Sequence, residues 1–163
     1  MRLRRYNFGF TLMELVLVLA IVAVVAMSAA PVLRGFVRGR AAGESAGVFI
    51  AATQYARSQA VSDGTTYRLN IDTAAGKWWL TMMDGSGAFV DVAASNGQGY
   101  TLPETVRMQT DAPTVDGMQV IEFDPMGRSD PATVTFTGTM GNSSAQVTAE
   151  TMLDVFHRVE EGP

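Results

Sequence analysis

The chain has 163 residues, 47% of them apolar, with a formal net charge of −4 and no cysteine. This length suits one modest domain with an appendage, and the lack of cysteine excludes disulfide bonds, thiol catalysis and cysteine-ligated metals. Three of the twelve basic residues precede Gly9, so the remainder has nine basic and sixteen acidic residues, a net charge of −7. An acidic chain repels phosphate backbones, and we therefore expect no nucleic acid among its partners.

The N-terminal forty residues begin with a short basic segment and continue as an apolar run. Three arginines precede the run, which extends over 24 residues from Phe10 to Leu33. As an α-helix these residues span about 36 Å, enough to cross a hydrocarbon core of about 30 Å. Basic residues on the N-terminal side keep that side in the cytoplasm by the positive-inside rule. We expect residues 10–34 to form a transmembrane helix, with the rest of the chain on the far side of the membrane.

A single carboxylate, Glu14, interrupts the apolar run one turn from its start. A charged side chain within a membrane helix costs on the order of 2.5–3.5 kcal/mol. One interpretation is that Glu14 extends toward the lipid headgroups, and the other is that it finds a positive partner in an assembled state. Cleavage after Gly9 would create such a partner, because the new amine of Phe10 lies four residues before Glu14 and can meet the Glu14 of a neighbouring chain.

The segment around these residues resembles the signature of the type IV pilin family, which includes the pseudopilins of type II secretion. The residues from Gly9 to Ile21 read GFTLMELVLVLAI. The resemblance implies a leader at residues 1–9, cleavage by a prepilin peptidase between Gly9 and Phe10, N-methylation of Phe10, and a role for Glu14 in docking into a helical filament. Pro31 falls at the family's helix-kinking position, and a proline removes one backbone hydrogen bond and clashes with a carbonyl of the preceding turn.

Two other interpretations of the N-terminal segment are an ordinary secretory signal and a plain single-pass anchor. The residues Ser28-Ala29-Ala30 would serve as the cleavage site of a secretory signal. A charged Glu14 inside the apolar core is unusual for such signals, and Pro31 would directly follow the cut. Both features favour the pilin-like interpretation.

Glycine recurs every fourth residue after the apolar run, and on a helix this spacing makes one stripe without side chains. Each glycine inside a helix costs roughly 0.8–1 kcal/mol relative to alanine, so the stripe is either a pliable tether or a surface for close packing against neighbouring helices. We expect residues 35–62 to continue the transmembrane helix into the periplasm. The stripe consists of Gly35, Gly39, Gly43 and Gly47.

The next segment predicts an amphipathic helix whose apolar face packs on a sheet. Phe49, Ala52, Ala56 and Ala60 recur at helical spacing, and Asp63-Gly64 marks the end of the helix. The anchor and this segment would together form one long helical spine.

Residues 63–163 predict a globular β domain, because β-branched and aromatic residues alternate with polar ones between turn signals. The fold class is therefore α+β, a long hydrophobic N-terminal helix packed on an antiparallel β-sandwich-like domain. A loop around Gly97, within Ala93–Pro103, is a candidate for partner contacts. The expected strands are Thr65–Asp72, Lys77–Met83, Ala88–Val92, Thr105–Thr110, Met118–Phe123, Thr133–Gly138, Ala145–Ala149 and Leu153–Val159.

The β domain is similar to the GspH/FimT-type minor pseudopilins. The similarity rests on the helical segment Ala56–Val61 with the strand Tyr67–Ile71, and on Ile121–Arg128 with the strand Thr133–Thr137. At the last strand the usual glycine-arginine pair is replaced by Phe156-His157-Arg158, so the resemblance is weaker there.

No group of residues in the domain predicts catalysis, and we expect neither an enzyme nor a cofactor. His157 is the only histidine, and no Gly-x-Ser-x-Gly motif accompanies it. Asp84 and Asp91 offer hard oxygen ligands near a turn, but their spacing does not follow a calcium motif, so no metal site is assigned. Trp78 and Trp79 are adjacent and on a strand would point to opposite faces, one into the core and the other outward.

Taken together, the two resemblances imply a minor pseudopilin of a bacterial type II secretion system. Such a subunit would lie in the inner membrane by a single span, with its C-terminal domain in the periplasm. It would assemble with other minor and major pseudopilins into the tip region of a periplasmic filament that supports protein export. The alternatives are a minor type IV pilin for pilus assembly or DNA uptake, and a signal-anchored periplasmic binding or enzymatic domain.

Overall fold

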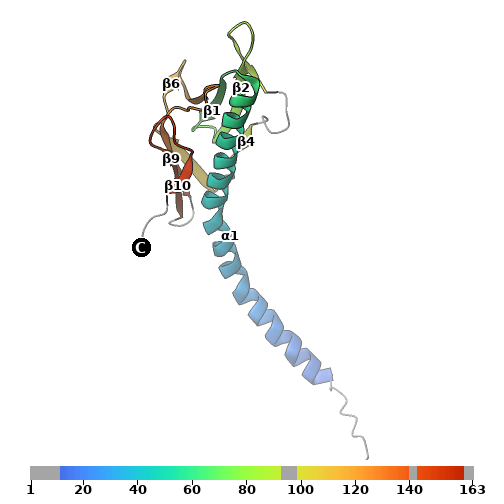
Figure 1. Cartoon of the computed structure of the whole chain (residues 1–163). Coiled ribbons are helices and arrows are strands. Elements are labelled where there is room, and N and C mark those ends of the chain that lie inside the picture. Colours follow the sequence, from blue (N-terminus) through green and yellow to red (C-terminus); the bar gives the residue numbers. More distant parts are fainter. Residues whose placement is uncertain (1–11, 93–98, 140–142, 160–163) are drawn as a thin grey trace, which may run out of the picture. The chain divides into compact units, whose positions relative to one another are not determined.

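The structure is a computed structural model that describes residues 12–92, 99–139 and 143–159, and for residues 28–39 only the helical backbone. The chain divides into two compact units, Met1–Val37 and Arg38–Pro163. A single helix, α1 (Leu12–Asp63), supplies all the described residues of the first unit and the first element of the second (Figure 1). It ends at the predicted place, since Gly64 follows with φ +65°, the left-handed conformation that glycine adopts after a helix.

The second unit adds two antiparallel sheets to the C-terminal part of α1. In one sheet the strand order is β3-β2-β1-β7-β6, with β4 also paired to β2, and in the other it is β10-β9-β8-β5. Among the described residues the strands are β1 (Tyr67–Asp72), β2 (Lys77–Met83), β3 (Phe89–Asp91), β4 (Tyr100–Thr101), β5 (Val106–Thr110), β6 (Thr114–Val115), β7 (Met118–Phe123), β8 (Ala132–Gly138), β9 (Ser144–Ala149) and β10 (His157–Val159).

The alternation of side chains along β1 decides which face of the first sheet joins the core. Leu69 on β1 lies opposite Leu80 on β2 and Ile121 on β7, and all three are buried. Arg68 and Asn70, the two neighbours of Leu69 on β1, point to the opposite face, as a two-residue period requires. The sheet therefore has one apolar face toward the core and an outer face that carries these polar side chains.

Helix α1 closes the core with a stripe of small residues and one aromatic side chain, Phe49. The Phe49 ring lies 5.3 Å from Trp78 on β2, 5.7 Å from Phe136 on β8 and 6.3 Å from Phe156 before β10, measured between ring centroids. One fully buried phenylalanine contributes about 1.5–3 kcal/mol, and this one connects the helix to both sheets. Its buried neighbours along α1 are Ala42, Ser45, Ala46, Thr53, Ala56 and Ala60.

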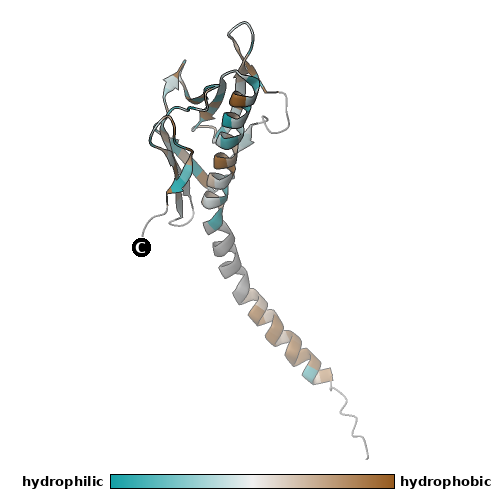
Figure 2. Ribbon diagram, viewed as in Figure 1, coloured by the Kyte–Doolittle hydropathy of each residue, from teal (hydrophilic) through white to brown (hydrophobic). Residues whose placement is uncertain are grey.

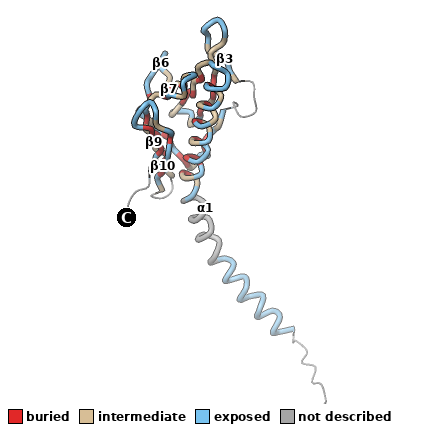
Figure 3. Tube along the Cα trace, viewed as in Figure 1, coloured by how far each residue is buried: buried red, intermediate tan, exposed pale blue. Residues whose placement is uncertain are grey.

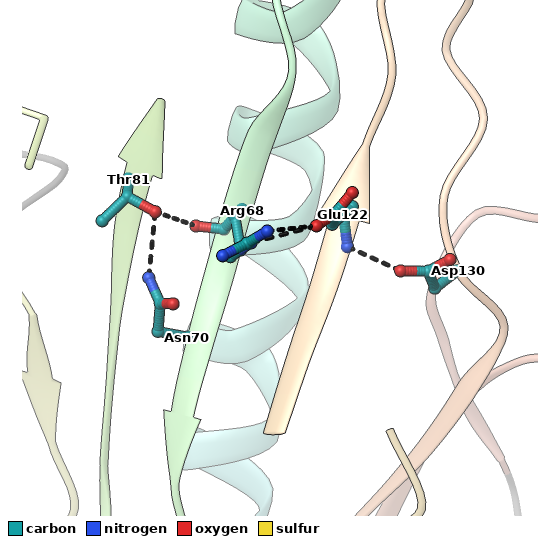
Figure 4. A network of polar contacts seen from close by, with 5 residues as sticks. All are labelled: Arg68, Asn70, Thr81, Glu122 and Asp130. Carbon is teal, nitrogen blue, oxygen red and sulfur yellow. Dashed lines mark hydrogen bonds and ion pairs between the residues drawn. The ribbon is translucent and has the colours of Figure 1, made fainter. Parts of the chain in front are cut away.

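The outer face of the first sheet carries a polar network (Figure 4). Arg68 donates from Nε and from Nη2 to Oε1 of Glu122, at 3.0 and 2.6 Å, and its guanidinium lies 3.6 Å from the centre of the Phe89 ring. Asp130 accepts a hydrogen bond from the Glu122 backbone N–H at 3.0 Å, and Thr81 accepts one from the Asn70 amide at 3.1 Å. These contacts connect β2, β1 and β7 on the side away from the core.

The predicted α+β fold class is confirmed, and the predicted start of the last strand is wrong. The last strand does not begin at Leu153, because Asp154 accepts a hydrogen bond from the Thr151 backbone N–H at 2.8 Å and forms a turn there. The strand begins at His157.

The expected loop Ala93–Pro103 contains the short strand β4, where Tyr100 packs on Trp78 with ring centroids 4.6 Å apart. The loop residues around Gly97 lie outside the described residues.

Strand β6 was not predicted. It comprises only Thr114 and Val115, both exposed, and it pairs with the beginning of β7 across the Asp116-Gly117 turn. Two exposed residues after a proline give no alternating pattern, so only the turn signal was visible in the sequence.

Candidate assembly site

The first described residues of α1 form an apolar helix that is exposed on all sides. From Leu12 to Met27 every residue is exposed, and the large apolar side chains range from 45% exposed at Val18 to 81% at Leu12. Figure 2 shows this apolar stretch, and Figure 3 shows that it is exposed along its length. A helix that is apolar all round needs lipid or other apolar helices to cover it. This segment is therefore a candidate surface for assembly.

Glu14 lies in the first turn of α1 and is exposed. A carboxylate at this position interacts favourably with the positive end of the helix dipole. It is also the only acidic residue between the start of α1 and Glu44. The arrangement presents one negative charge at the end of an otherwise apolar surface.

Several predicted site residues are not tested by the structure. Gly9 and Phe10 lie outside the described residues, and the surroundings of Pro31, Gly35 and Gly39 are not described. The backbone of α1 is helical through Pro31, so the predicted kink stays a prediction. Within the described part of the chain, no helix combines the length and the hydropathy needed to cross a membrane.

The two remaining glycines of the predicted stripe have different surroundings. A Cβ atom added to Gly43 would lie 3.2 Å from Nη1 and 3.3 Å from Nη2 of Arg158 on β10, so this glycine gives the guanidinium its place beside the helix. A Cβ added to Gly47 would meet nothing within 4 Å, and Gly47 is exposed. Gly47 therefore leaves its stretch of helix open to another molecule.

Arg57 is a positioning residue that the sequence analysis did not identify. From the middle of α1 it donates to Oγ of Ser129 at 3.0 Å, to the carbonyl of Leu153 at 3.5 Å and to the carbonyl of Asp154. Arg57 thereby attaches the segment between β9 and β10 to the helix. Arg57 and Asp154 are 97 positions apart in the sequence. In the sequence Arg57 lies off the predicted apolar stripe of the helix, and its partners are too distant along the chain to be visible there.

Two aspartates are used to build turns. Asp84 accepts hydrogen bonds from the hydroxyl and backbone N–H of Ser86 and from the N–H of Ala88, and these lower its pKa below the ordinary value. Burial acts to raise the pKa of Asp124, but the hydrogen bonds from the backbone and side chain of Arg128 and from the N–H of Met126 outweigh it and lower that pKa. Both carboxylates are therefore engaged by their own turns.

The residues considered for chemistry do not come together. His157 is exposed at the start of β10, where Nδ1 lies 3.1 Å from the carbonyl of Val155. Among the described residues, no group of three or more histidine, aspartate or glutamate side chains is placed to hold a metal ion. Trp78 is the tryptophan in the core, and Trp79 is half-buried on the outer face, with Lys77 Nζ 5.1 Å from the centre of its ring.

Comparison with known proteins shows which family combines such a helix with such a domain. The sequence matches the family of the type II transport protein GspH over residues 45–151. The chain belongs to the GspH family. Residues 4–30 of this GspH-family chain also match the prokaryotic N-terminal methylation motif. No curated protein matches the sequence at a significant level.

Solved structures of low sequence identity share the fold. The minor pseudopilin EpsH of the Vibrio cholerae type 2 secretion system superposes with a TM-score of 0.64 at 15% identity, covering 76% of this chain and 99% of EpsH. Escherichia coli GspH gives a TM-score of 0.58 at 12% identity, with 74% and 89% coverage. The type IV minor pilin FimU of Pseudomonas aeruginosa gives 0.52 at 15% identity, with 69% and 84% coverage.

The resemblance to GspH-type pseudopilins and the predicted function in type II secretion are thus confirmed by the family. Membership implies assembly with other pseudopilins and processing by a prepilin peptidase, and the N-terminal motif indicates a membrane-anchored protein with a periplasmic domain. The family consists of transport proteins, and the expected lack of catalysis stays a prediction.

Proposed function

We propose that this chain is a minor subunit of the pseudopilus of a bacterial type II secretion system. A single span would hold it in the inner membrane, and its β domain would lie in the periplasm. The observation that carries the proposal is the exposed apolar stretch of α1, with Glu14 in its first turn, in a chain whose remainder is a GspH domain. Such a helix is unstable in water, whereas a membrane and then a filament core would cover it.

The filament would be held together through the ends and sides of these helices. Cleavage between Gly9 and Phe10 would give Phe10 a positive amine, which N-methylation leaves charged. That amine would pair with Glu14 of a neighbouring subunit, because an ion pair offsets the cost of a carboxylate in an apolar surrounding. The open surface at Gly47 would allow a neighbouring helix to approach the backbone closely.

The β domain would give the subunit its place in the filament. The helix supplies interactions that every pilin-like subunit shares, so specificity must come from the surfaces of the two sheets. We place the subunit in the tip region, together with other minor pseudopilins and a major one. Its action would be mechanical: subunits leave the membrane pool, enter the growing filament, and the filament moves exported proteins outward.

Replacing Glu14 by alanine tests this proposal. Glu14→Ala removes the charge that pairs with the amine, so the variant should remain in the membrane but enter filaments at least about tenfold less, since tenfold corresponds to 1.4 kcal/mol. The measurement is site-specific crosslinking to other pseudopilins in secreting cells, with export of a secreted protein as the second readout.

The matched control is Glu150→Ala, which removes an exposed carboxylate from the β domain. It should crosslink and secrete as the parent does. If Glu14→Ala enters filaments as well as the control, Glu14 does not dock the subunit and the proposed role is wrong.

The second candidate is a minor subunit of a type IV pilus, favoured by the shared fold with FimU. Both assemblies would use Glu14 in the same way. They differ in their partners, so crosslinking of the β domain in cells that carry both systems separates them: products with pilus subunits alone would favour the second candidate.

A further inference from the structure

We propose that a site between α1 and the β9–β10 hairpin region of the β domain binds the phosphate of an anionic lipid headgroup through Arg158 and Arg40. The site is a hollow of ≈ 370 Å³ lined by Arg40, Gly43 and Glu44 of α1, Ser144 of β9 and Arg158 of β10. All five residues belong to the second unit. The inference rests on the proposed function only in requiring that the chain is anchored in a membrane.

Gly43 lets the Arg158 guanidinium lie close to the helix. Both terminal nitrogens of Arg158 would lie within 3.3 Å of a Cβ atom at this position, so an added methyl group would require the guanidinium to shift by a few tenths of an ångström. Among the described residues, the side chain of Arg158 has no hydrogen bond and no ion pair. Its planar group thus lies beside the helix with its donors available to a ligand.

The chemistry of the hollow suits a phosphate group. A guanidinium donates two parallel hydrogen bonds to phosphate oxygens, and two of them from different elements can hold one phosphate from two sides. The hydroxyl of Ser144 adds a further donor. Two arginines and one glutamate, Glu44, line the hollow, in a unit that has eight basic and fifteen acidic residues.

The position of Arg40 in the sequence favours a lipid over the other sources of an anion. No acidic residue occurs between Glu14 and Glu44, and the first residues after the apolar run include Arg34, Arg38 and Arg40. Arg40 lies seven residues, about two helical turns, after the last residue of that run. Basic residues next to a membrane segment attract anionic lipids. Arg158 is far from Arg40 in the sequence, and only the fold brings the two residues to the same hollow.

Such a site would give the subunit a defined state before assembly. A lipid bound in this hollow would hold the domain against the membrane surface while the subunit remains in the membrane pool. Entry into the filament would release the lipid, so the two states would differ in whether the hollow is occupied.

Native mass spectrometry of the full-length chain in detergent tests the proposal, with phosphatidylglycerol and phosphatidylcholine as probes. We expect the chain to retain phosphatidylglycerol in preference to phosphatidylcholine. Arg158→Gln should reduce retention at least about tenfold, the effect of losing 1.4 kcal/mol. Gly43→Ala should reduce it less, because the new methyl group requires only a small shift of the guanidinium. Arg107→Gln, which removes an exposed arginine from β5 outside the hollow, should retain lipid as the parent does.

Three outcomes would overturn the proposal. Equal loss in Arg158→Gln and Arg107→Gln would indicate general charge attraction, and inorganic phosphate that displaces phosphatidylglycerol at equal concentration would indicate a site for free phosphate. Unchanged lipid retention in Arg158→Gln, with reduced crosslinking to other subunits, would assign the hollow to a carboxylate of a neighbouring subunit. Because retention is measured on the isolated chain, its failure is distinct from a failure of Glu14→Ala in filaments.

Discussion

At the scale of single residues, Tyr67 shows how burial and one carboxylate act on the same group. Tyr67 is buried at the start of β1, and its hydroxyl donates to Oδ2 of Asp63, the last residue of α1, at 2.6 Å. Burial is the largest cause and this hydrogen bond the next, and together they raise the pKa of Tyr67 to about 12. The hydroxyl thereby connects the end of the helix to the first strand.

This raised pKa predicts a loss of stability in alkali. Between about pH 10 and pH 12 the unfolded chain releases the Tyr67 proton while the folded chain keeps it, so the contribution present below pH 10 is lost as the pH rises. The free energy of unfolding should fall by roughly 2 kcal/mol over this range. Urea unfolding of the full-length chain in detergent measures it. In Tyr67→Phe the decrease should be smaller by that amount, and an unchanged decrease would contradict the assignment.

Glu14 differs from Tyr67 because its partner is expected in another chain. Inside one subunit the carboxylate is exposed at the start of an apolar helix, and its role becomes testable only in an assembly. Arg158 belongs to the same class. For both residues the informative experiment measures binding to another molecule and not the stability of the fold.

At the scale of elements, the C-terminal segment depends on the helix more than on its own strand. Strand β10 has three residues, all exposed, and pairs only with β9. The preceding turn is held by Arg57 and by the buried ring of Phe156. The attachment of this segment is therefore decided by side chains of α1.

Arg57→Met should loosen this attachment, because it keeps the aliphatic stem and removes the guanidinium. The loss of three hydrogen bonds, one of them to a buried serine, should lower the free energy of unfolding by about 1–3 kcal/mol. Amide hydrogen exchange of residues 151–156 should accelerate more than exchange in β1 or β7. Arg107→Met, an exposed arginine on β5, is the control and should change neither quantity. Uniform acceleration in all strands would show that Arg57 has no local role.

At the scale of the whole molecule, processing is the first event that the family membership implies. In cells with an active prepilin peptidase, the chain recovered from membranes should lack Met1–Gly9 and begin with a methylated Phe10. Intact mass and N-terminal sequencing measure both changes together. Cells without the peptidase serve as the control and should yield the uncut chain.

A different N-terminus would contradict the assignment of the leader. An end near Pro31 would indicate an ordinary secretory signal, and an uncut chain despite active peptidase would indicate a plain anchor. Either result would leave the GspH domain in place and remove the mechanism proposed for its assembly.

The sequence by itself determined that a long helix precedes a series of strands, and it determined most bounds of the longer strands. The apolar run, its single carboxylate and the residues around Gly9 are local features, readable without any tertiary partner. The C-terminal end of α1 was predicted within a residue and both ends of β2 and β7 were matched, because alternation and turn glycines are also local.

Only the tertiary structure decided which distant residues meet. It places Asp154 beside Arg57, Phe156 against Phe49, and Arg158 beside Gly43, all of which depend on how the C-terminal segment returns to the helix. It also decided the two-residue strands β4 and β6, which are too short to show a pattern and exist through pairing with their neighbours. Contacts of this kind arise from the packing of the whole domain, and no local sequence signal carries them.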